Sequence, residues 1–483
     1  FRLVSEYKVK IKVLKPEGTS YANVTIPYYD LSNNTMRENI IGLDASAYYM
    51  ENGKMVLEEI YRFENGMDHK DGKLLWDVNR LFGEIVAGMK KCKELGKIPV
   101  SMAIDTWAVD YVLLDEKDQI LGDTYGYRDH RTDGMDAEVA KILPETELYG
   151  KTGIQKQIFN TVYQLMAVKQ QTPELLQQAK TLLMLPDYFG FRLTGNKLSE
   201  YTNGSTTQLV NPDTFQWDKE LIRKLGYPED IFLPLQMPGT KVGQLLPEIQ
   251  KEVGFDLEVV LCGSHDTASA VMAVPQTEGD GIYISSGTWS LMGIESLKPV
   301  ITEDAAAANF TNEGGYDHRF RFLKNIMGLG MIQSVRHEYN DAYSFAQLCD
   351  MAEESKEFPS RVDVNDQSFL SPDSMVEAIR QYCHKTGQPV PESVGELTSV
   401  VYRSLAQSYG ETVRGLEKIA GKTYDSIHII GGGSNAAYLN QLTADATGKT
   451  VYAGPGEATA IGNLLAQMIH AGDLADLKGA RQC

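Results

Sequence analysis

Two short segments of the sequence hold residue types suited to phosphoryl transfer. Ser264 to Ala268 reads Ser-His-Asp-Thr-Ala and places the carboxylate of Asp266 beside the imidazole of His265. Tyr283 to Ser290 follows it and contains a run of small residues whose backbone N–H groups can approach a phosphate. Transfer of a phosphoryl group to a hydroxyl requires a base close to a phosphate-binding turn. The two segments together predict a small-molecule kinase.

Each segment also has an ordinary structural interpretation. Asp is a favoured helix N-cap, and an apolar run begins directly after Asp266. His265 alone is more often a hydrogen-bonded structural histidine than a catalytic one. The Ser285-Ser286-Gly287-Thr288 turn has a composition that ordinary hairpins share. Both interpretations stay open when these residues are considered alone.

A third segment, Gly431 to Asn435, follows an expected strand over 426–430 and precedes an expected helix over 436–447. Such a turn suits an anion or a nucleotide at a helix N-terminus. Gly431-x-Gly433-x-x-Ala436 also fits the loose dinucleotide fingerprint, so a nicotinamide dehydrogenase is the rival prediction. That fingerprint requires an acidic residue at the end of the next strand. Here the strand over 450–453 leads into Gly-Pro-Gly, which disfavours the dehydrogenase.

The fourth segment, Ile104 to Tyr111, carries two aspartates and Trp107, and Tyr127 to Arg131 follows it. Carboxylates beside aromatic rings are typical of sugar sites, because they accept hydroxyl protons and offer a flat apolar face. The alternative is a core Trp107 between two strands, with Arg128 and Asp129 as a surface ion pair. We leave both open. The protein-kinase H-R-D order and the Walker A loop are absent from the sequence.

Composition narrows the choice of partners and compartment. The 483-residue chain has a net charge of −19, which disfavours nucleic acid as a partner. No run of about 18 apolar residues predicts a membrane span, and the first residues lack the apolar core of a secretory signal. Five separated cysteines form neither a disulfide framework nor a zinc site. We therefore expect a cytoplasmic protein with small-molecule partners, and the sequence gives no oligomeric state.

Periodicity predicts the elements that must position these segments. A strand over 259–262 leads into the Ser-His-Asp run, and a helix over 267–274 follows it. Further helices are expected over 74–95, 175–194, 394–419 and 458–471, with strands over 8–14, 23–29, 100–104 and 111–114. The turn at 51–54 indicates a hairpin with a strand over 55–63. Strands that alternate with helices predict an α/β fold.

The length predicts more than one domain. The polar run Pro275 to Gly281 has Pro at one end and glycines at the other, and β-rich sequence resumes after it. We place the boundary there, with an N-terminal sugar-kinase domain over 1–274 and a C-terminal nucleotide-binding domain over 275–483.

Together these segments resemble the FGGY family of carbohydrate kinases. The resemblance runs from about residue 52 to near the C-terminus, and it is carried by TWAVDYVLLD with YRDHRT, SHDTASAV, YISSGTWSLMG, KNIMGLGMIQSVR and HIIGGGSNAAYLNQLTADATG. It implies two ribonuclease-H-like domains of the actin and hexokinase type, with the active site in the cleft between them. It also implies ATP and Mg²⁺ as cofactors and phosphorylation of the C1 hydroxyl of L-rhamnulose, or of a related deoxyketose such as L-fuculose.

The resemblance assigns roles to individual residues. It makes Asp266 the proton acceptor. It implies that the sugar is bound by Ala108, His265, Asp266, Thr267 and Asn325. It implies that the nucleotide is bound by Thr288, Gln333 and Gly432.

The first 50 or so residues depart from the family. The family opens with a strand and an Asp-x-Gly-Ala-Ser-Ser-Gly-Arg loop around the ATP phosphates, and this chain has no such run. The segment from Asp30 to Arg37 keeps an Asp, hydroxyls and an Arg but no Gly, and Leu43 to Ala47 is a second degraded candidate. We prefer Asp30 and Arg37 as phosphate-loop residues. The departure motivates an alternative function, a catalytically weakened sensor of sugar or nucleotide on the kinase fold.

Overall fold

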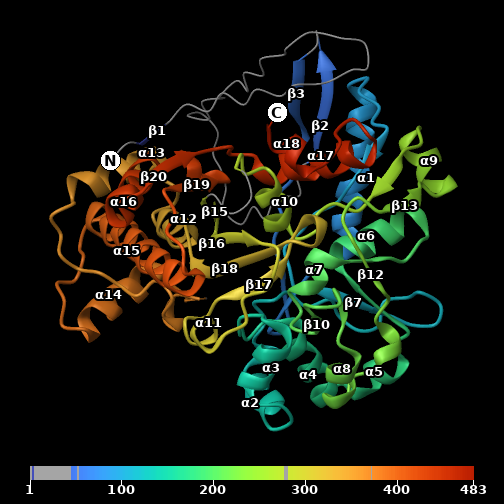
Figure 1. Ribbon diagram of the computed structural model, residues 1–483, viewed down its shortest axis with the longest axis horizontal. Coiled ribbons are helices and arrows are strands. Elements are labelled where there is room, and N and C mark those ends of the chain that lie inside the picture. The colour runs from blue at the N-terminus through green and yellow to red at the C-terminus, as the bar shows by residue number, and fades with distance from the viewer. Residues whose placement is uncertain (1–2, 5–44, 52–53, 277–280, 371, 483) are drawn as a thin grey trace.

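The computed structural model describes residues 3–4, 45–51, 54–276, 281–370 and 372–482. The candidate phosphate-loop residues Asp30 and Arg37, and the strands expected over 8–14 and 23–29, lie outside the described residues. The described chain forms two α/β lobes, with the earlier residues mostly on the right of Figure 1 and the later ones mostly on the left.

A seven-stranded sheet forms the centre of the second lobe. Its strands β1, β20, β19 and β15 run parallel, whereas β15, β16, β18 and β17 are joined antiparallel. Parallel neighbours need a crossover, and α16 supplies one between β19 and β20. In sheet order the strands are β1 (Leu3–Val4), β20 (Thr450–Ala453), β19 (Ser426–Ile430), β15 (Ile282–Ser286), β16 (Trp289–Ser296), β18 (Phe320–Met327) and β17 (Thr311–Gly314).

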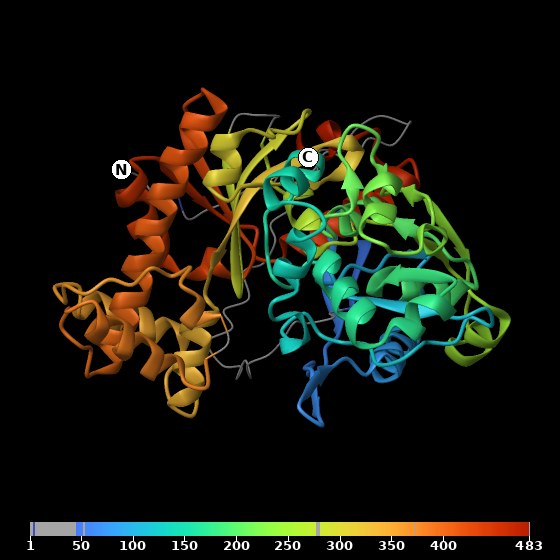
Figure 2. The ribbon, with the colours of Figure 1, turned by 90° about the horizontal axis from the view of Figure 1, so that it is seen from below.

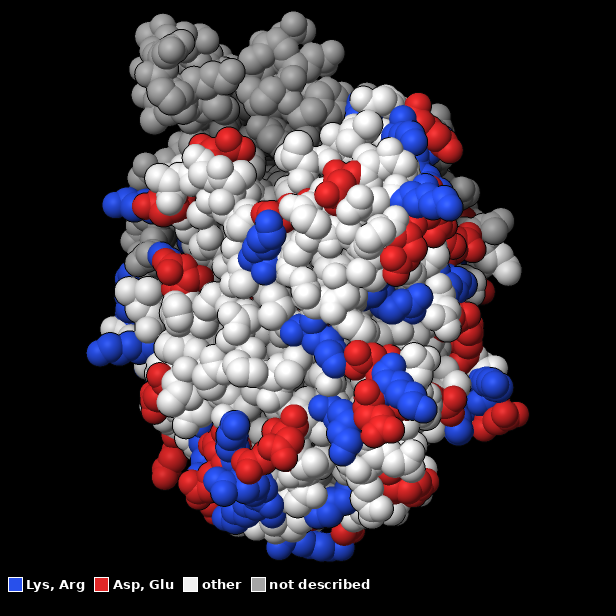
Figure 3. All heavy atoms as spheres, turned by 90° about the vertical axis from the view of Figure 1, so that its right-hand side faces the viewer, with Lys and Arg blue, Asp and Glu red and all other residues white. Residues whose placement is uncertain are grey.

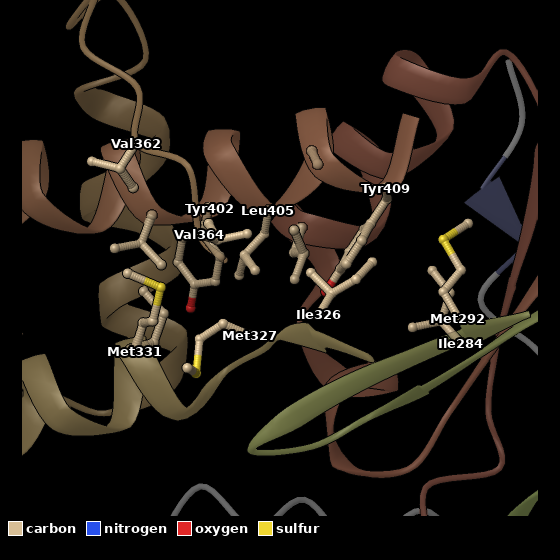
Figure 4. Close-up of a cluster of buried hydrophobic side chains, with 14 of the residues drawn as sticks. Ile284, Met292, Ile326, Met327, Met331, Val362, Val364, Tyr402, Leu405 and Tyr409 are labelled. Carbon is tan, nitrogen blue, oxygen red and sulfur yellow. The ribbon is translucent and has the colours of Figure 1, made fainter. Parts of the chain in front are cut away.

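The long helix α15 (Val394–Ala420) packs its apolar face on this sheet. Tyr402, Leu405 and Tyr409 of α15 point toward side chains from the strands, among them Ile284 and Ile326 (Figure 4). Full burial of side chains of this size contributes about 1.5–3 kcal/mol each. The hydroxyl of Tyr409 also meets Ser290 Oγ at 2.6 Å, which satisfies both buried polar groups.

The first lobe is built on smaller sheets. β13 (Lys241–Gln244), β14 (Glu258–Val260) and β6 (Ser101–Met102) form one, and β7 (Tyr111–Leu114) pairs with β8 (Thr181–Met184) in another. The expected hairpin at 51–54 is present as β2 (Ala45–Glu51) and β3 (Lys54–Tyr61), which project from the lobe in Figure 2. The helix expected over 74–95 is α1 (Val78–Glu94), capped by Asp77.

The prediction of a single helix over 175–194 is wrong. Its middle is β8 (Thr181–Met184), which lies between α5 (Pro173–Gln178) and α6 (Leu185–Thr194) and pairs antiparallel with β7. All four β8 residues are buried. An apolar run that is buried on both faces carries no period, so the sequence cannot separate a strand from a helix there.

The remaining elements connect and cover these sheets. The helices are α2 (Met135–Ala140), α3 (Glu145–Thr152), α4 (Thr161–Gln171), α7 (Tyr201–Ser205), α8 (Lys219–Lys224), α9 (Pro247–Val253), α10 (Asp266–Met272), α11 (Glu303–Ala307), α12 (Gly330–Glu338), α13 (Phe345–Glu354), α14 (Met375–Lys385), α16 (Ala437–Thr447), α17 (Ala458–His470) and α18 (Leu477–Gln482). The short strands are β4 (Asp68–Lys70), β5 (Lys73–Leu75), β9 (Ser199–Glu200), β10 (Val210–Asn211), β11 (Gln216–Trp217) and β12 (Leu235–Gln236).

The C-terminal helices return to α10, as Figure 1 shows. A Cβ on Gly462 of α17 would lie 1.7 Å from the carbonyl oxygen of Ser269, so only glycine permits this approach. Arg481 of α18 donates to the carbonyls of Val271 and Met272 at the end of α10 and pairs with Glu295 of β16 at 2.6 Å. α10 is thus held from both lobes, and the boundary between residues 274 and 275 stays a prediction.

Charges of both signs alternate on the surface of the first lobe. On the face shown in Figure 3, blue and red side chains are interspersed over the described residues. Ion pairs such as Lys90–Glu252 and Lys197–Asp118 belong to this lobe. None of the described helices combines the length and the apolar character that a membrane span requires.

Candidate active site

Asp266 is the first residue of α10, directly after the loop that follows β14. The preceding His265 occupies the N-cap position and makes no side-chain cap hydrogen bond. The backbone N–H of Asp266 donates to the carbonyl of Thr106 at 2.8 Å, which ties the helix start to the loop after β6. The Asp266 side chain is 43% exposed, so its carboxylate reaches solvent. Asp266 is therefore not the N-cap that the structural interpretation expected.

The two oxygens of the Asp266 carboxylate differ. Oδ1 accepts from the Thr267 backbone N–H at 2.6 Å and from Thr267 Oγ1 at 3.2 Å. It also lies 3.3 Å from His265 Nε2. No hydrogen bond to Oδ2 is found among the described residues. A carboxylate anchored through one oxygen leaves the other to receive a proton in a defined direction.

Buried Glu200 holds the loop before α10. Its Oε2 accepts from the Ser264 hydroxyl at 2.5 Å and from the Ser264 backbone N–H at 3.2 Å. It also accepts from the Thr202 hydroxyl and the Asn203 backbone N–H. Burial raises the pKa of Glu200, and these donors act against that rise. The sequence analysis missed Glu200, because its contact with Ser264 joins residues 64 positions apart.

The sugar-site interpretation of Trp107 and Asp110 is wrong. Both are buried, and the indole N–H of Trp107 donates to Asp110 Oδ2 at 2.8 Å. The indole of Trp76 and the amide of Gln164 donate to the same carboxylate. Burial raises the Asp110 pKa to about 6 even though these donors favour the ionised form. Trp107 therefore belongs to the core of the first lobe, as the core-Trp alternative predicted, and Asp110 is held by donors inside it.

The prediction of a surface ion pair between Arg128 and Asp129 is also wrong. Asp129 is buried and accepts from the backbone N–H groups of Leu74 and Arg131. Its carboxylate organises two backbone segments instead of pairing with Arg128.

Ala108 is only partly buried, and the next residue, Val109, has a φ of 67°. A β-branched residue in the left-handed region is strained. The carbonyl of Val109 accepts from Thr161 Oγ1 at 2.7 Å and from Gln164 Nε2 at 3.2 Å, which holds the turn in this conformation. Ala108 is thus partly exposed beside the clamped turn, as are Ile104 and Asp105 earlier in the segment.

Two small-residue turns lie together at the ends of β15 and β19. These strands are parallel neighbours, with Ser285 opposite Ile430, so the turns that follow them are adjacent. The first turn is a hairpin between β15 and β16, as its composition indicated. A Cβ on Gly433 would lie 1.9 Å from Ser286 Oγ, whereas a Cβ on Gly432 would meet nothing within 4 Å. The second turn therefore packs tightly on one side and is open on the other.

The predicted nucleotide positions are connected. Thr288 Oγ1 donates to Gln333 Oε1 of α12 at 3.3 Å. The backbone of Gly330 also donates to the Thr288 carbonyl, so the hairpin and α12 form one unit. The open side of the Gly432 turn and the Thr288–Gln333 pair fit a phosphate-bearing ligand, which backbone N–H groups and small hydroxyls can bind.

Asn325 of β18 contacts the first lobe. Its Nδ2 donates to Gln155 Oε1 at 2.9 Å, and Gln155 comes from the loop between α3 and α4. Asn325 is therefore joined to the first lobe. The roles of Ala108, His265, Thr267 and Asn325 at the sugar site remain predictions, and His265 and Thr267 both contact the Asp266 carboxylate.

The described residues include no group of three or more His, Cys, Asp or Glu side chains that could hold a metal ion. Mg²⁺ in kinase sites is bound through substrate phosphates and one or two carboxylates, so such a group is not required.

Two family models match the chain. The FGGY family of carbohydrate kinases, N-terminal domain, matches residues 45–273, and the C-terminal domain of the same family matches residues 282–471. The second match includes the Gly431 to Asn435 turn, which removes the dehydrogenase alternative. The first match begins at residue 45, a few residues before the point near residue 52 where the resemblance was expected to start.

Several curated relatives are similar over most of their length. A rhamnulokinase from Halalkalibacterium halodurans is 53% identical over 431 residues, which is 89% of this chain and 92% of the relative. A rhamnulokinase from Oceanobacillus iheyensis is 50% identical over 436 residues, covering 90% and 92%. One from Bacillus subtilis is 45% identical over 436 residues, covering 90% and 89%.

Solved structures share the fold. A ligand-bound xylulose kinase from Lactobacillus acidophilus superimposes with a TM-score of 0.72 at 17% identity and covers 89% of this chain and 88% of its own. A Plasmodium falciparum glycerol kinase with ADP gives a TM-score of 0.69 at 14% identity, covering 88% and 87%. The predicted fold, two ribonuclease-H-like ATPase domains, is confirmed.

Proposed function

This chain belongs to the FGGY family of carbohydrate kinases, and we propose that it transfers the γ-phosphoryl group of ATP to the C1 hydroxyl of L-rhamnulose. The products are ADP and L-rhamnulose 1-phosphate, as in the breakdown of rhamnose. The observation that carries this proposal is the 53% identity to a rhamnulokinase over 431 residues. No finding favours the alternative of a catalytically weakened sensor.

In the proposed reaction Asp266 is the general base. Its Oδ2 takes the proton of the sugar hydroxyl while the oxygen attacks the γ-phosphorus and the bond to the β-phosphate oxygen breaks. A positioned carboxylate contributes about 10²- to 10⁴-fold to such a step. The half-exposed position of Asp266 supports this role, because a substrate can reach it. His265, Thr267, Ala108 and Asn325 are the proposed sugar neighbours.

On the other side of the site, the nucleotide would be held by Thr288, Gln333 and Gly432. The turn at Gly432 offers backbone N–H groups to phosphate oxygens on its open side. When bound with ATP, Mg²⁺ supplies positive charge that neutralises the phosphate oxygens. Asp30 and Arg37 stay predictions for the phosphate loop.

A panel of sugars tests the proposal. The purified chain is mixed with ATP, Mg²⁺ and either L-rhamnulose, L-fuculose, D-xylulose or glycerol, and ADP release is followed while NMR locates the phosphate on the product. We expect the highest kcat/KM for L-rhamnulose, with phosphate on C1. L-fuculose differs in the configuration of one hydroxyl, and a site that hydrogen-bonds hydroxyls discriminates against such a change. Sugar binding without ADP release would establish the sensor instead.

The sugar and ATP are small-molecule partners. We propose that the protein binds neither nucleic acid nor membranes, because its net charge is −19 and it has no long apolar run. The cytoplasm is the proposed compartment, because the reaction consumes ATP.

A further inference from the structure

His265 is contacted from both lobes. Its side chain is 7% exposed, and its Nε2 lies 3.3 Å from Asp266 Oδ1. On the opposite edge of the ring, Nδ1 lies 3.0 Å from Nη2 of Arg321. Arg321 is on β18 in the second lobe and is fully buried. The imidazole therefore stands between the proposed base and a buried guanidinium.

The contact with Arg321 determines which imidazole nitrogen carries the proton. A guanidinium has only N–H donors and does not lose its proton in proteins. Nδ1 must therefore accept from Arg321, and a neutral imidazole that accepts at Nδ1 carries its proton on Nε2. Nε2 is the ring nitrogen that lies 3.3 Å from Asp266 Oδ1, the oxygen that also accepts from Thr267.

Glu313 of β17 competes for the same nitrogen. Its Oε2 is 3.4 Å from His265 Nδ1 and 3.1 Å from Arg321 Nη2. Burial alone would raise the pKa of Glu313, yet the Arg321 guanidinium holds that pKa below its usual value. Glu313 is therefore ionised, and it would draw a second proton onto His265 if Arg321 did not occupy the space beside Nδ1.

Arg321 is itself held in place. Its Nε donates to the carbonyl of Gly314 at 2.8 Å, and the backbone N–H of Gly314 donates to Ser205 Oγ of α7 at 2.7 Å. The second lobe's sheet is thereby fastened to the first lobe next to His265. A side chain this rigid can impose one orientation on its neighbour.

We propose that Arg321 is a positioning residue for the phosphoryl transfer: by donating to Nδ1 it places the imidazole proton of His265 on Nε2, the nitrogen beside Asp266 Oδ1, so that Oδ2 remains available for the sugar proton. This inference rests on the proposed role of Asp266. Arg321 touches neither sugar nor nucleotide and acts through His265.

Removing Arg321 changes the charges around the imidazole. The groups facing His265 are then Asp266 from α10 and Glu313 from β17, both anionic, while the phenols of Tyr201 and Tyr283 interact electrostatically with the guanidinium that is removed. An imidazole between two carboxylates binds a second proton more readily. The imidazolium would attract Asp266 and weaken it as a base, and this effect grows as the pH falls.

The first test is the pH dependence of kcat with L-rhamnulose and ATP for the wild-type enzyme and Arg321→Met. We expect kcat about 10- to 100-fold lower, KM for ATP within about two-fold of wild type, and a new loss of activity on the acid side of the profile. The double variant Arg321→Met/Glu313→Gln should recover part of kcat, because a neutral amide no longer stabilises the imidazolium. The matched control is Arg319→Met, since Arg319 is also buried but pairs with Asp317.

An unchanged pH profile in Arg321→Met, or an identical change in Arg319→Met, would overturn the proposal. The second test needs neither turnover nor a variant of Arg321. In ¹⁵N-histidine-labelled wild-type protein, the His265 signal is assigned among the 8 histidines by its loss in His265→Gln. We expect a protonated Nε2 and an unprotonated Nδ1 near neutral pH, and a protonated Nδ1 would contradict the inference. Because this readout is independent of activity, it separates a wrong inference from a wrong proposed function.

Discussion

The two sides of the candidate site differ in what sets their geometry: side chains on one side and the backbone on the other. Around Asp266 the side chains decide the geometry: His265, Arg321 and Glu313 meet through charged and hydrogen-bonding groups that are largely buried. Around the Gly431 to Asn435 turn the backbone decides it, and the essential feature is the absence of a side chain at Gly433. The base side therefore depends on charge and tautomer, and the nucleotide side depends on steric fit.

This difference has a consequence for mutations. A change of charge on the base side should alter kcat and its pH dependence while nucleotide affinity is kept. A change of volume on the nucleotide side should alter ATP affinity while the pH dependence is kept. The following experiments test that separation, beginning with the largest expected effect.

Asp266→Asn should lower kcat by about 10²-fold or more, because an amide cannot accept the sugar proton. L-rhamnulose binding should largely survive, since the amide oxygen still accepts from Thr267. Coupled ADP release measures kcat, and calorimetric titration with the sugar measures binding. Activity near wild type would remove Asp266 from the base role and erase the contrast between the two sides.

Gly433→Ala should raise KM for ATP about ten-fold and lower the melting temperature, because the added methyl would overlap Ser286 Oγ. The control is Gly432→Ala, whose methyl enters open space. It should raise KM for ATP by filling the predicted nucleotide position, without lowering the melting temperature of the free protein. Equal melting temperatures for the two variants would mean that the turn is not tightly packed against the hairpin.

Asp110→Asn should change activity by less than about two-fold, because Asp110 lies in the core and not in the site. Its effect should instead appear in stability. The folded-state pKa of about 6 is above the usual value, so the protonated form is favoured by folding and stability falls as pH rises from about 4 through 6. Between pH 4 and pH 7, the unfolding free energy of the Asn variant should fall by about 1–3 kcal/mol less than that of the wild-type protein. An equal fall in unfolding free energy in both proteins would contradict this role of Asp110.

Local sequence patterns located most of the elements that carry the site. α15 (Val394–Ala420) and β19 (Ser426–Ile430) closely match the helix and strand expected from periodicity and turn residues. β14 and α10 also lie where they were expected, around the Ser-His-Asp run. β8 was mistaken for part of a helix, because burial on both faces removes the alternation on which the prediction relies.

Side-chain roles were harder to predict than elements. Trp107 and Asp110 have the residue types of a sugar site, yet Asp110 accepts from two indoles inside the core. Glu200 and Arg321 carry no local motif, although each makes close contacts beside His265 or Ser264. Whether a carboxylate faces a substrate or a buried donor depends on which distant segments fold against it.

By itself the sequence determined the α/β class, the family resemblance and the segments that hold the base and the glycine turn, because short-range residue order controls helix starts, strands and turns. Tertiary structure alone decided which oxygen of Asp266 accepts from Thr267, which nitrogen of His265 lies beside Arg321 and which aspartate is buried. Those properties depend on distances of about 3 Å between residues far apart in the chain, where hydrogen bonds and charges act strongly because water is excluded.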